Sequence, residues 1–315
     1  MASRKRSSMP GSPSGEQRRG RRRKTDLGVG DIKVAIGGAD DLHAARALAY
    51  AVRDFSGAGD DPAAPTLRQG LGPAVKAVMA RSDDWRRMIG DGRFSLAAQP
   101  IVSLADRAIH HYEVLARFPG GRQPFETVRF AEEIGLIEEF DLAVCAKALA
   151  ALDAMPDLSL AVNLSGRSVQ NAGFCDAIRA LLRPHRSRLD RLMFELTESH
   201  AIECFEPPAT FLKWLKSAGC SVCLDDFGAG AATYHYLRHF DFDFIKIDGP
   251  FLKAASSNRR DRVLVRSICS LCRELEIGVI GEMIEDEAAL EAADALGIGY
   301  GQGRLFGAPT PLMQG

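Results

Sequence analysis

The sequence has no apolar run of about 18 residues, the length that a membrane-spanning helix needs, and no hydrophobic leader segment near its first residue. It also lacks a G-x-G-x-x-G motif after a first strand, a Walker loop and a G-x-S-x-G motif. These absences leave dehydrogenase, kinase and hydrolase-fold interpretations without support. The lack of a long apolar run and of a leader segment gives no indication of secretion or of membrane insertion.

The seven cysteines are an odd number scattered along 315 residues, which is typical of reduced thiols in a cytoplasmic protein. Two C-x-x-C pairs have a spacing that also occurs in zinc sites, Cys220 with Cys223 and Cys269 with Cys272. The first pair lies in a strand pattern, where residues three apart point to opposite faces, and the second lies on an amphipathic helix. We therefore expect buried thiols rather than zinc ligands.

The formal net charge of -1 conceals an uneven distribution of charge. Residues 1–24 contain Glu16 and nine basic residues: Arg4, Lys5, Arg6, Arg18, Arg19, Arg21, Arg22, Arg23 and Lys24. This segment is rich in Gly, Ser, Pro and Arg, so residues 1–30 are predicted to be a disordered basic tail. A solvated tail is favoured over one that touches nucleic acid or anionic lipid, and no nucleic acid polymer is expected as a partner.

Composition and spacing divide the rest of the chain into two parts. Residues 31–93 are predicted to be a helical and linker segment, with an Ala-rich helix through Ala44–Phe55, a linker at Gly57–Pro65 and a helix through Leu67–Ile89. Residues 94–315 alternate short apolar runs with amphipathic stretches, as expected of a single α/β domain.

Eight apolar runs in this domain have the length of strands, and most are followed by a helical pattern. The strands are expected at Phe94–Leu104, His111–Phe118, Leu158–Leu164, Leu192–Leu196, Ser221–Leu224, Phe242–Ile247, Ile277–Ile280 and about Gly299–Leu305. The helices are expected at Phe140–Met155, Ser168–Leu182, Pro208–Ala218, Val263–Leu275 and Asp286–Leu296. The pattern favours a closed α/β barrel over an open doubly wound sheet, although the spacing alone is compatible with both.

Polar residues stand where these apolar runs stop: Glu113, Asn163, Glu195, Asp225 with Asp226, Lys246, Glu282 and Gln302. A barrel brings the carboxyl ends of its parallel strands to one face, where its active sites lie. Adjacent buried carboxylates need cations, and either basic side chains or a metal can supply them. So many acids on one face favour Mg²⁺ or Mn²⁺, and a pair of such ions is the arrangement used in phosphodiester cleavage.

Lys246 shares a strand face with Asp248, because residues two apart on a strand point the same way. Beside divalent ions, a lysine can orient or deprotonate a water molecule or neutralise phosphate charge. The alternative is that Lys246 only balances the neighbouring acids. His235 and His239 are four apart on a predicted helix, but no H-E-x-x-H motif surrounds them and a solvated face is favoured.

An ordered set of short motifs over Phe94–Pro311 resembles the EAL-domain family, the bacterial phosphodiesterases that hydrolyse cyclic di-GMP to linear pGpG. The motifs are Gln99-Pro-Ile-Val, Glu113-Val-Leu-Ala-Arg, Asn163-Leu-Ser, Glu195-Leu-Thr-Glu, Asp225-Asp-Phe-Gly-Ala-Gly, Lys246-Ile-Asp, Glu282-Met-Ile-Glu and Gln302-Gly-Arg-Leu-Phe. The resemblance implies a TIM-like (β/α)8 barrel with one antiparallel strand, two Mg²⁺ or Mn²⁺ ions, inhibition by Ca²⁺, a homodimer and signalling protein partners.

The resemblance also implies a role for each site residue. The metal ligands would be Glu113, Asn163, Glu195, Asp225 and Asp226, and the catalytic residues Lys246, Glu282 and Glu113. The substrate-binding residues would be Gln99, Leu115, Arg117, Asp248 and Gln302, and Glu198 would anchor the loop after the aspartate pair.

The chain departs from the family pattern at four positions. Val114 and Met283 replace Ala and Gly, and Ala229 and Ala231 replace Thr and Tyr in the loop after the aspartate pair. The complete set of metal-type residues favours an active phosphodiesterase. The altered motifs favour the alternative, a receptor that binds cyclic di-GMP with little or no turnover. A third and less favoured class is an interaction module that binds no nucleotide.

Overall fold

The computed structural model describes residues 25–29, 32–36, 45–52, 71–197, 202, 204–228 and 233–312. The chain divides into two compact units, Met1–Val75 and Lys76–Gly315. In the first unit, β1 (Thr25–Val29) pairs antiparallel with β2 (Ile32–Ile36), and residues 45–52 are helical with Ala47 and Ala51 buried.

The β1–β2 pair differs from the expected tail and helical segment. In β2, Ile32, Val34 and Ile36 stand at every second position, and such β-branched residues at a period of two favour a strand. The Ala-rich helix is present at residues 45–52, and residues 1–24 lie outside the described part. The domain limits at residues 30 and 93 remain predictions.

The second unit contains a closed barrel of eight strands. Their order around the barrel is β10-β9-β8-β7-β6-β5-β4-β3, and β10 also pairs with β3. The strands are β3 (Ser95–Ser103), β4 (Ile109–Arg117), β5 (Leu160–Ser165), β6 (Leu192–Thr197), β7 (Ser221–Phe227), β8 (Phe244–Ile247), β9 (Gly278–Gly281) and β10 (Tyr300–Gln302). The predicted barrel is confirmed, and all eight expected strands are present.

One barrel strand runs against the others. β3 is antiparallel to both β4 and β10, whereas the pairs from β4 to β10 are parallel. A short strand outside the barrel, β11 (Thr310–Pro311), also pairs antiparallel with β3. The predicted antiparallel strand is therefore confirmed, and seven parallel strands point their carboxyl ends toward one mouth.

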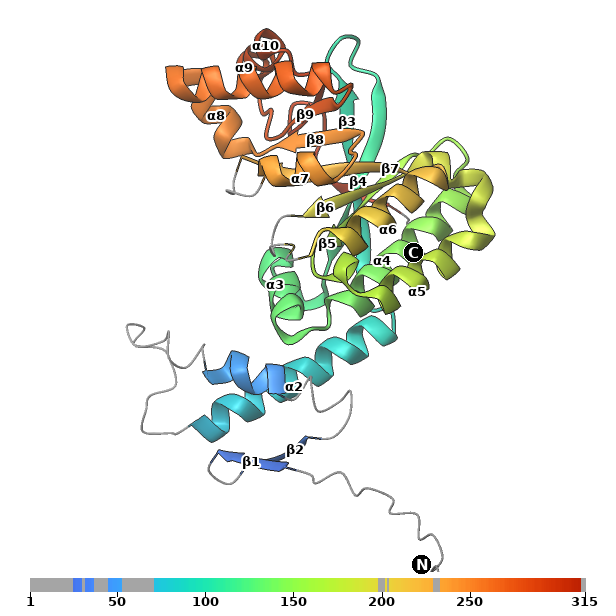
Figure 1. Cartoon of the computed structure of the whole chain (residues 1–315), viewed down its shortest axis with the longest axis vertical. Helices are drawn as coiled ribbons and strands as arrows, with labels where there is room; N and C mark the ends of the chain where they lie inside the picture. Colours follow the sequence, from blue (N-terminus) through green and yellow to red (C-terminus); the bar gives the residue numbers. More distant parts are fainter. Residues whose placement is uncertain are drawn as a thin grey trace, which may run out of the picture. The chain divides into compact units, whose positions relative to one another are not determined.

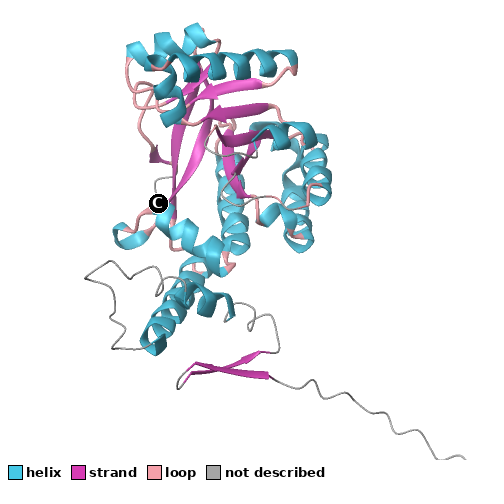
Figure 2. Cartoon of the chain, turned by 60° about the vertical axis from the view of Figure 1, so that its left-hand side comes forward, coloured by secondary structure: helices cyan, strands magenta, loops and turns pink. Residues whose placement is uncertain are grey.

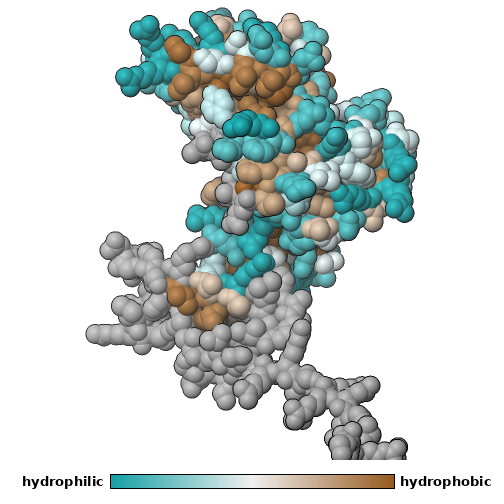
Figure 3. Space-filling view, in the orientation of Figure 1, coloured by the Kyte–Doolittle hydropathy of each residue, from teal (hydrophilic) through white to brown (hydrophobic). Residues whose placement is uncertain are grey.

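Figures 1 and 2 show the helices, most of which pack around the barrel strands. They are α2 (Leu71–Gly90), α3 (Pro124–Ile134), α4 (Ile137–Ala154), α5 (Ala172–Leu182), α6 (Glu206–Ser217), α7 (Thr233–His239), α8 (Gly249–Ser257), α9 (Arg259–Glu274) and α10 (Glu287–Leu296). Hydrophobic surface shows along α8 and α9 (Figure 3), where Val263 and Leu264 are about half exposed. No described helix is both long and apolar enough to cross a membrane.

Local chemistry fixes several helix ends. Asn171 and Asp286 accept hydrogen bonds from backbone N–H groups in the first turns of α5 and α10, at 2.8 Å each. α10 ends at Gly297, whose φ of 87° is a left-handed conformation that glycine adopts without steric cost. Asn171 and Asp286 therefore fix where α5 and α10 begin, and Gly297 fixes where α10 ends.

An apolar layer fills the barrel interior. Ile101, Ala161, Met193, Cys223 and Ile280 come from five different strands and are at most 5% exposed, and Phe244 and Tyr300 pack against them. Barrel interiors are filled by such layers of side chains rather than forming a pore. This layer closes the barrel beneath the mouth and supports the residues that follow it along each strand.

Truncation of this layer should destabilise the protein. We expect Ile101→Ala to lower the free energy of unfolding by about 2–5 kcal/mol, because it leaves a cavity in a closed core. Ile109→Ala on the neighbouring strand is the matched control, since Ile109 is 53% exposed and its loss should change stability by less than about 0.5 kcal/mol. Urea unfolding measures both, and equal effects would contradict the assignment of the core.

Candidate functional site

A polar layer lies directly above the apolar layer. Seven of the eight strands contribute a residue, in the strand or directly after it, two positions from an apolar-layer residue, because side chains two apart on a strand point to the same face. The pairs are Ile101 with Gln99, Ala161 with Asn163, Met193 with Glu195, Cys223 with Asp225, Phe244 with Lys246, Ile280 with Glu282 and Tyr300 with Gln302. β4 places Glu113 beside Gln99 by strand pairing. The structure thus brings all these predicted residues together.

Lys246 lies at the centre of this layer and is 1% exposed. Its Nζ lies 2.9 Å from Glu282 Oε1, 3.1 Å from Glu113 Oε2, 3.3 Å from Glu195 Oε2 and 3.4 Å from Asp225 Oδ1. One ammonium therefore contacts carboxylates from four different strands or strand ends.

Amide side chains hold Glu113 from both sides. Asn163 Nδ2 donates to Glu113 Oε1 at 2.9 Å, and Gln302 Nε2 donates to Glu113 Oε2 at 2.7 Å. Gln302 Nε2 also lies 3.1 Å from Gln99 Oε1, and Gln99 Nε2 donates to the Gly307 carbonyl at 3.2 Å. This chain of hydrogen bonds fixes the position of the Glu113 carboxylate.

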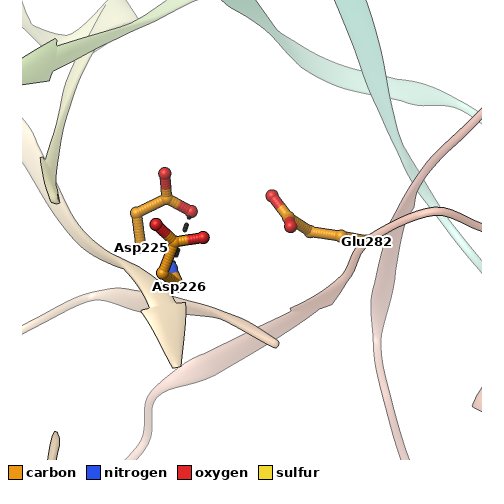
Figure 4. A group of neighbouring side chains, drawn as sticks. All are labelled: Asp225, Asp226 and Glu282. Carbon is orange, nitrogen blue, oxygen red and sulfur yellow. Dashed lines mark hydrogen bonds between the residues drawn. The ribbon is translucent and has the colours of Figure 1, made fainter. Parts of the chain in front are cut away.

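A bulge in β7 brings two adjacent carboxylates to the same mouth. Neighbouring residues on a regular strand point to opposite faces, but the pairing of β7 with β8 shifts register between Leu224 and Phe227. Asp226 has a φ of 57°, and its N–H donates to Asp225 Oδ1 at 2.9 Å. Glu282 faces the two aspartates (Figure 4), and a ligand oxygen from each of the three lies within 4.8 Å of the others.

Four of the five acids of the layer hold protons more strongly than usual. Burial, together with the neighbouring carboxylates, raises the pKa of Glu195 well above its usual range and also raises the pKa of Asp225. The same causes raise the pKa of Asp226 to about 6 and that of Glu282 to about 7. Repulsion among buried negative charges therefore remains after Lys246 has made its contacts.

The pKa shifts of Glu113 and Lys246 both favour the charged form of the side chain. Burial opposes ionisation of both, but the Lys246 ammonium and the amide donors lower the pKa of Glu113. The surrounding carboxylates raise the pKa of Lys246 well above its usual value, with Asp225 and Glu113 making the largest contributions. The surrounding carboxylates thus keep Lys246 protonated, and its ammonium balances part of their negative charge.

The donor atoms of the layer fit a divalent cation. Among the described residues, five carboxylates (Glu113, Glu195, Asp225, Asp226 and Glu282) surround one ammonium, so negative charge is in excess. Within the same described part, Asn163 Oδ1 and Glu195 Oε1 are buried without a hydrogen-bond partner. Orphaned oxygen atoms beside excess negative charge are the environment that a hard cation such as Mg²⁺ or Mn²⁺ prefers.

A cavity of about 730 Å³ opens beside the polar layer. Asn163 and Asp226 line it from the polar layer, and Leu115 and Arg117 line it from β4. The substrate-binding role of Leu115 and Arg117 stays a prediction. Further lining residues are Val114, Pro124, Phe125, Val128, Arg129, Ile137, Phe140 and Val144. Its volume is that of a pocket for a small-molecule ligand.

The cavity wall also contains a buried acidic network that the sequence analysis missed. Asp141 Oδ2 accepts hydrogen bonds from Ser165 N–H at 3.1 Å and from Ser168 Oγ at 2.6 Å. Ser165 Oγ donates to Glu132 Oε1 at 2.8 Å, and Glu132 also lines the cavity. Burial raises the pKa of Asp141 to about 7. Its position inside a predicted amphipathic helix gave no sign that it faces a cavity.

The remaining predicted residues lie apart from this layer or outside the described part. Asp248 precedes α8, is half-buried, and contributes to the raised pKa of Asp226. Glu198, Ala229 and Ala231 lie outside the described residues. Met283 has a φ of 54° and is 56% exposed. The thiols of both C-x-x-C pairs are buried and free, as expected.

The comparison with known proteins assigns the chain to a family. The model of the EAL domain matches residues 82–309, well over half of the chain.

The chain belongs to the EAL domain family.

Two curated relatives share this EAL domain. The cyclic di-GMP phosphodiesterase PdeF of Escherichia coli K12 is 34% identical over 247 residues, which cover 76% of this chain and 33% of PdeF. The cyclic di-GMP phosphodiesterase PdeB of Shewanella oneidensis is 34% identical over 233 residues, covering 71% of this chain and 27% of PdeB. The match thus spans a third or less of the length of these relatives.

Solved EAL domains have the same fold. The PaMucR phosphodiesterase in complex with c-di-GMP superposes with a TM-score of 0.66 at 29% identity, covering 74% of this chain and 98% of that one. The FimX EAL domain of Xanthomonas citri in complex with c-diGMP gives a TM-score of 0.66 at 25% identity, covering 76% of this chain and 98% of that one.

Removal of the central ammonium should make the fold depend on divalent ions. We expect Lys246→Met to lower the free energy of unfolding by about 3–5 kcal/mol in EDTA, because buried carboxylates lose their partner. Millimolar Mn²⁺ should restore part of that loss. Thermal unfolding with and without Mn²⁺ measures both effects, with Lys253→Met on the exposed side of α8 as control. Identical unfolding of the two variants would contradict the central position of Lys246.

Asp141 should impose a pH dependence on stability. The folded protein holds its proton up to about pH 7, whereas the unfolded chain releases it near 3.8. Its contribution is therefore complete below about pH 4 and is lost as the pH rises through 7, by about 1.4 kcal/mol per pH unit at most.

The Asp141→Asn variant tests this dependence, because the amide oxygen can still accept from Ser165 and Ser168. We expect its free energy of unfolding to fall less between pH 4 and 8 than that of the unmodified protein. Chemical denaturation at several pH values measures the difference, and Asp157→Asn, at an exposed position, is the control. Parallel pH profiles for all three proteins would argue against a raised pKa at Asp141.

Proposed function

We propose that this chain is a cyclic di-GMP phosphodiesterase that hydrolyses its substrate to pGpG with two Mg²⁺ or Mn²⁺ ions. The observation that carries the proposal is the polar layer of an EAL domain beside a ligand-sized cavity. In this layer Lys246 contacts four carboxylates, Asp226 lies beside two of them, and Asn163 donates to a third. The names of PdeF, PdeB and PaMucR support cyclic di-GMP as the ligand.

The proposed metal ligands are Glu113, Asn163, Glu195, Asp225 and Asp226. When bound, paired divalent ions supply an activated water and neutralise charge on the leaving oxygen. Lys246 would hold that water or the phosphate by its ammonium, and Glu282, at 2.9 Å, would orient the Lys246 side chain and accept a hydrogen bond from water. Gln302 and Gln99 would keep the Glu113 carboxylate in place.

The cavity would hold the rest of the dinucleotide. Arg117 and Leu115 line it, so the guanidinium is available to a phosphate and the leucine side chain to a base. Asp248 remains a proposed substrate contact at the same mouth, and Glu198 a proposed anchor of the loop after the aspartates. The homodimer, the signalling partners and the inhibition by Ca²⁺ stay predictions from the family resemblance, and the cytoplasmic location stays a prediction from the scattered cysteines.

A receptor without turnover is the second candidate. Two observations favour it: Val114 replaces alanine directly beside Glu113, and Met283 occupies a left-handed conformation directly after Glu282. Val114 is nevertheless buried and Glu113 retains all its hydrogen bonds, while Glu282 still reaches Lys246. Since a receptor has no need for the complete set of metal-type residues, we favour the enzyme.

Purified protein with Mg²⁺ or Mn²⁺ should convert cyclic di-GMP to pGpG, as measured by chromatography of the nucleotides. We expect Glu113→Gln to reduce kcat at least 100-fold, because the amide removes a ligand charge at the centre of the layer. Glu139→Gln, at an exposed position of α4, should retain full activity. Tight binding of cyclic di-GMP with no turnover in either metal would establish the receptor instead.

A further inference from the structure

Helix α3 has a second face that points into the cavity. Its residues Thr127, Phe130, Ala131 and Ile134 are buried in the protein. Residues at positions i, i+3, i+4 and i+7 of the other face line the cavity: Phe125, Val128, Arg129 and Glu132. The spacing is that of one continuous helix face. Because α3 separates the protein interior from the cavity, the identities of these four residues shape the ligand space.

Phe125 stands at the start of this second face. It is 76% exposed, the largest exposed fraction among the large hydrophobic side chains of the described residues, although it borders the cavity. Pro124 precedes it at the beginning of α3, where the fixed φ of proline favours the helical conformation and holds the first turn in place. An aromatic ring on a rigid helix end is therefore presented to the cavity.

The cavity wall combines polar and apolar side chains. Asn163 and Asp226 line the part shared with the polar layer, whereas Val114, Phe140 and Val144 make other parts of the wall apolar. A ligand with a phosphate at the polar layer would have to place flat or apolar groups against the remaining walls. A cyclic dinucleotide has this division, since its phosphodiester ring carries two purine bases.

We propose that Phe125 stacks on a guanine base of cyclic di-GMP and sets the affinity for the substrate without taking part in the chemical step. The inference rests on the proposed function. Stacking on an aromatic side chain is available to every base through its π-face, and its loss on substitution by alanine typically weakens binding about 5- to 150-fold. Phe125 is thus a binding residue on the outer wall, distinct from the residues of the polar layer.

Three substitutions separate stacking from simple burial of apolar area. Phe125→Ala removes the side chain, Phe125→Leu keeps an apolar side chain without a flat ring, and Phe125→Tyr keeps the ring. Leu264→Ala on α9, a half-exposed position in the same domain, is the control. Calorimetry with cyclic di-GMP and Ca²⁺ measures Kd, and the hydrolysis assay with Mn²⁺ gives KM and kcat.

We expect Phe125→Ala to raise Kd and KM about tenfold with kcat within about twofold, which is the signature of lost binding that is equal in substrate and transition state. Phe125→Tyr should match the unmodified protein, and Phe125→Leu should resemble Phe125→Ala. Unchanged affinity in Phe125→Ala, or full recovery in Phe125→Leu, would overturn the stacking role while leaving the phosphodiesterase intact. Absence of both binding and hydrolysis in the unmodified protein would instead overturn the proposed function on which this inference depends.

Discussion

The two-residue period of the barrel strands determines the position of the whole site. On the parallel strands an inward side chain of the apolar layer is followed two residues later by an inward polar side chain, as Met193 is by Glu195 and Phe244 by Lys246. On the antiparallel strand β3 the order is reversed, and Gln99 precedes Ile101. The apolar layer excludes water from the barrel interior, so the polar layer that packs on it is partly desolvated and rigidly supported. Desolvation strengthens the attraction of Lys246 for the acids and also their mutual repulsion. The strand register therefore fixes the positions of the site residues and also gathers an excess of negative charge among them.

Two backbone irregularities supplement this regular pattern. The bulge at Asp225 and Asp226 adds a second carboxylate that a regular strand would have turned toward the helices. The left-handed conformation of Asp226 is tolerated better by aspartate than by most residues. Met283 adopts a similar φ directly after Glu282, and its side chain lies over Gly249, where an added Cβ would come within 2.3 Å of Met283 Cγ. A neighbouring glycine thus accommodates the methionine that stands in place of a family glycine.

The sequence could predict those features that repeat with a simple period. The eight strands could be read from the short apolar runs, and the polar site residues from the points where these runs end. Glu113 and Lys246 could be expected to meet, because a closed barrel brings the ends of its parallel strands to one mouth. The sequence could not predict α3 or the Asp141 network. Asp141 lies in a helix of mixed polarity. Its partner Ser165 ends β5 and its partner Ser168 follows that strand, so their contact with Asp141 depends on how α4 packs against β5. The β1–β2 pair was missed because β1 lies in the segment assigned to the basic tail and β2 in the segment assigned to helix and linker.

The polar layer and the cavity wall obey different constraints. A change at Glu113 or Lys246 disturbs several partners at once, because each of these side chains contacts residues from at least two other strands or strand ends. Phe125, by contrast, is largely exposed and lies on a helix whose buried face is made by other residues. Its identity can change without loss of the fold. Among chains with this architecture, we therefore expect differences in ligand affinity to come from residues on the cavity face of α3. The catalytic chemistry depends on the polar layer, whose positions are fixed by the strand register.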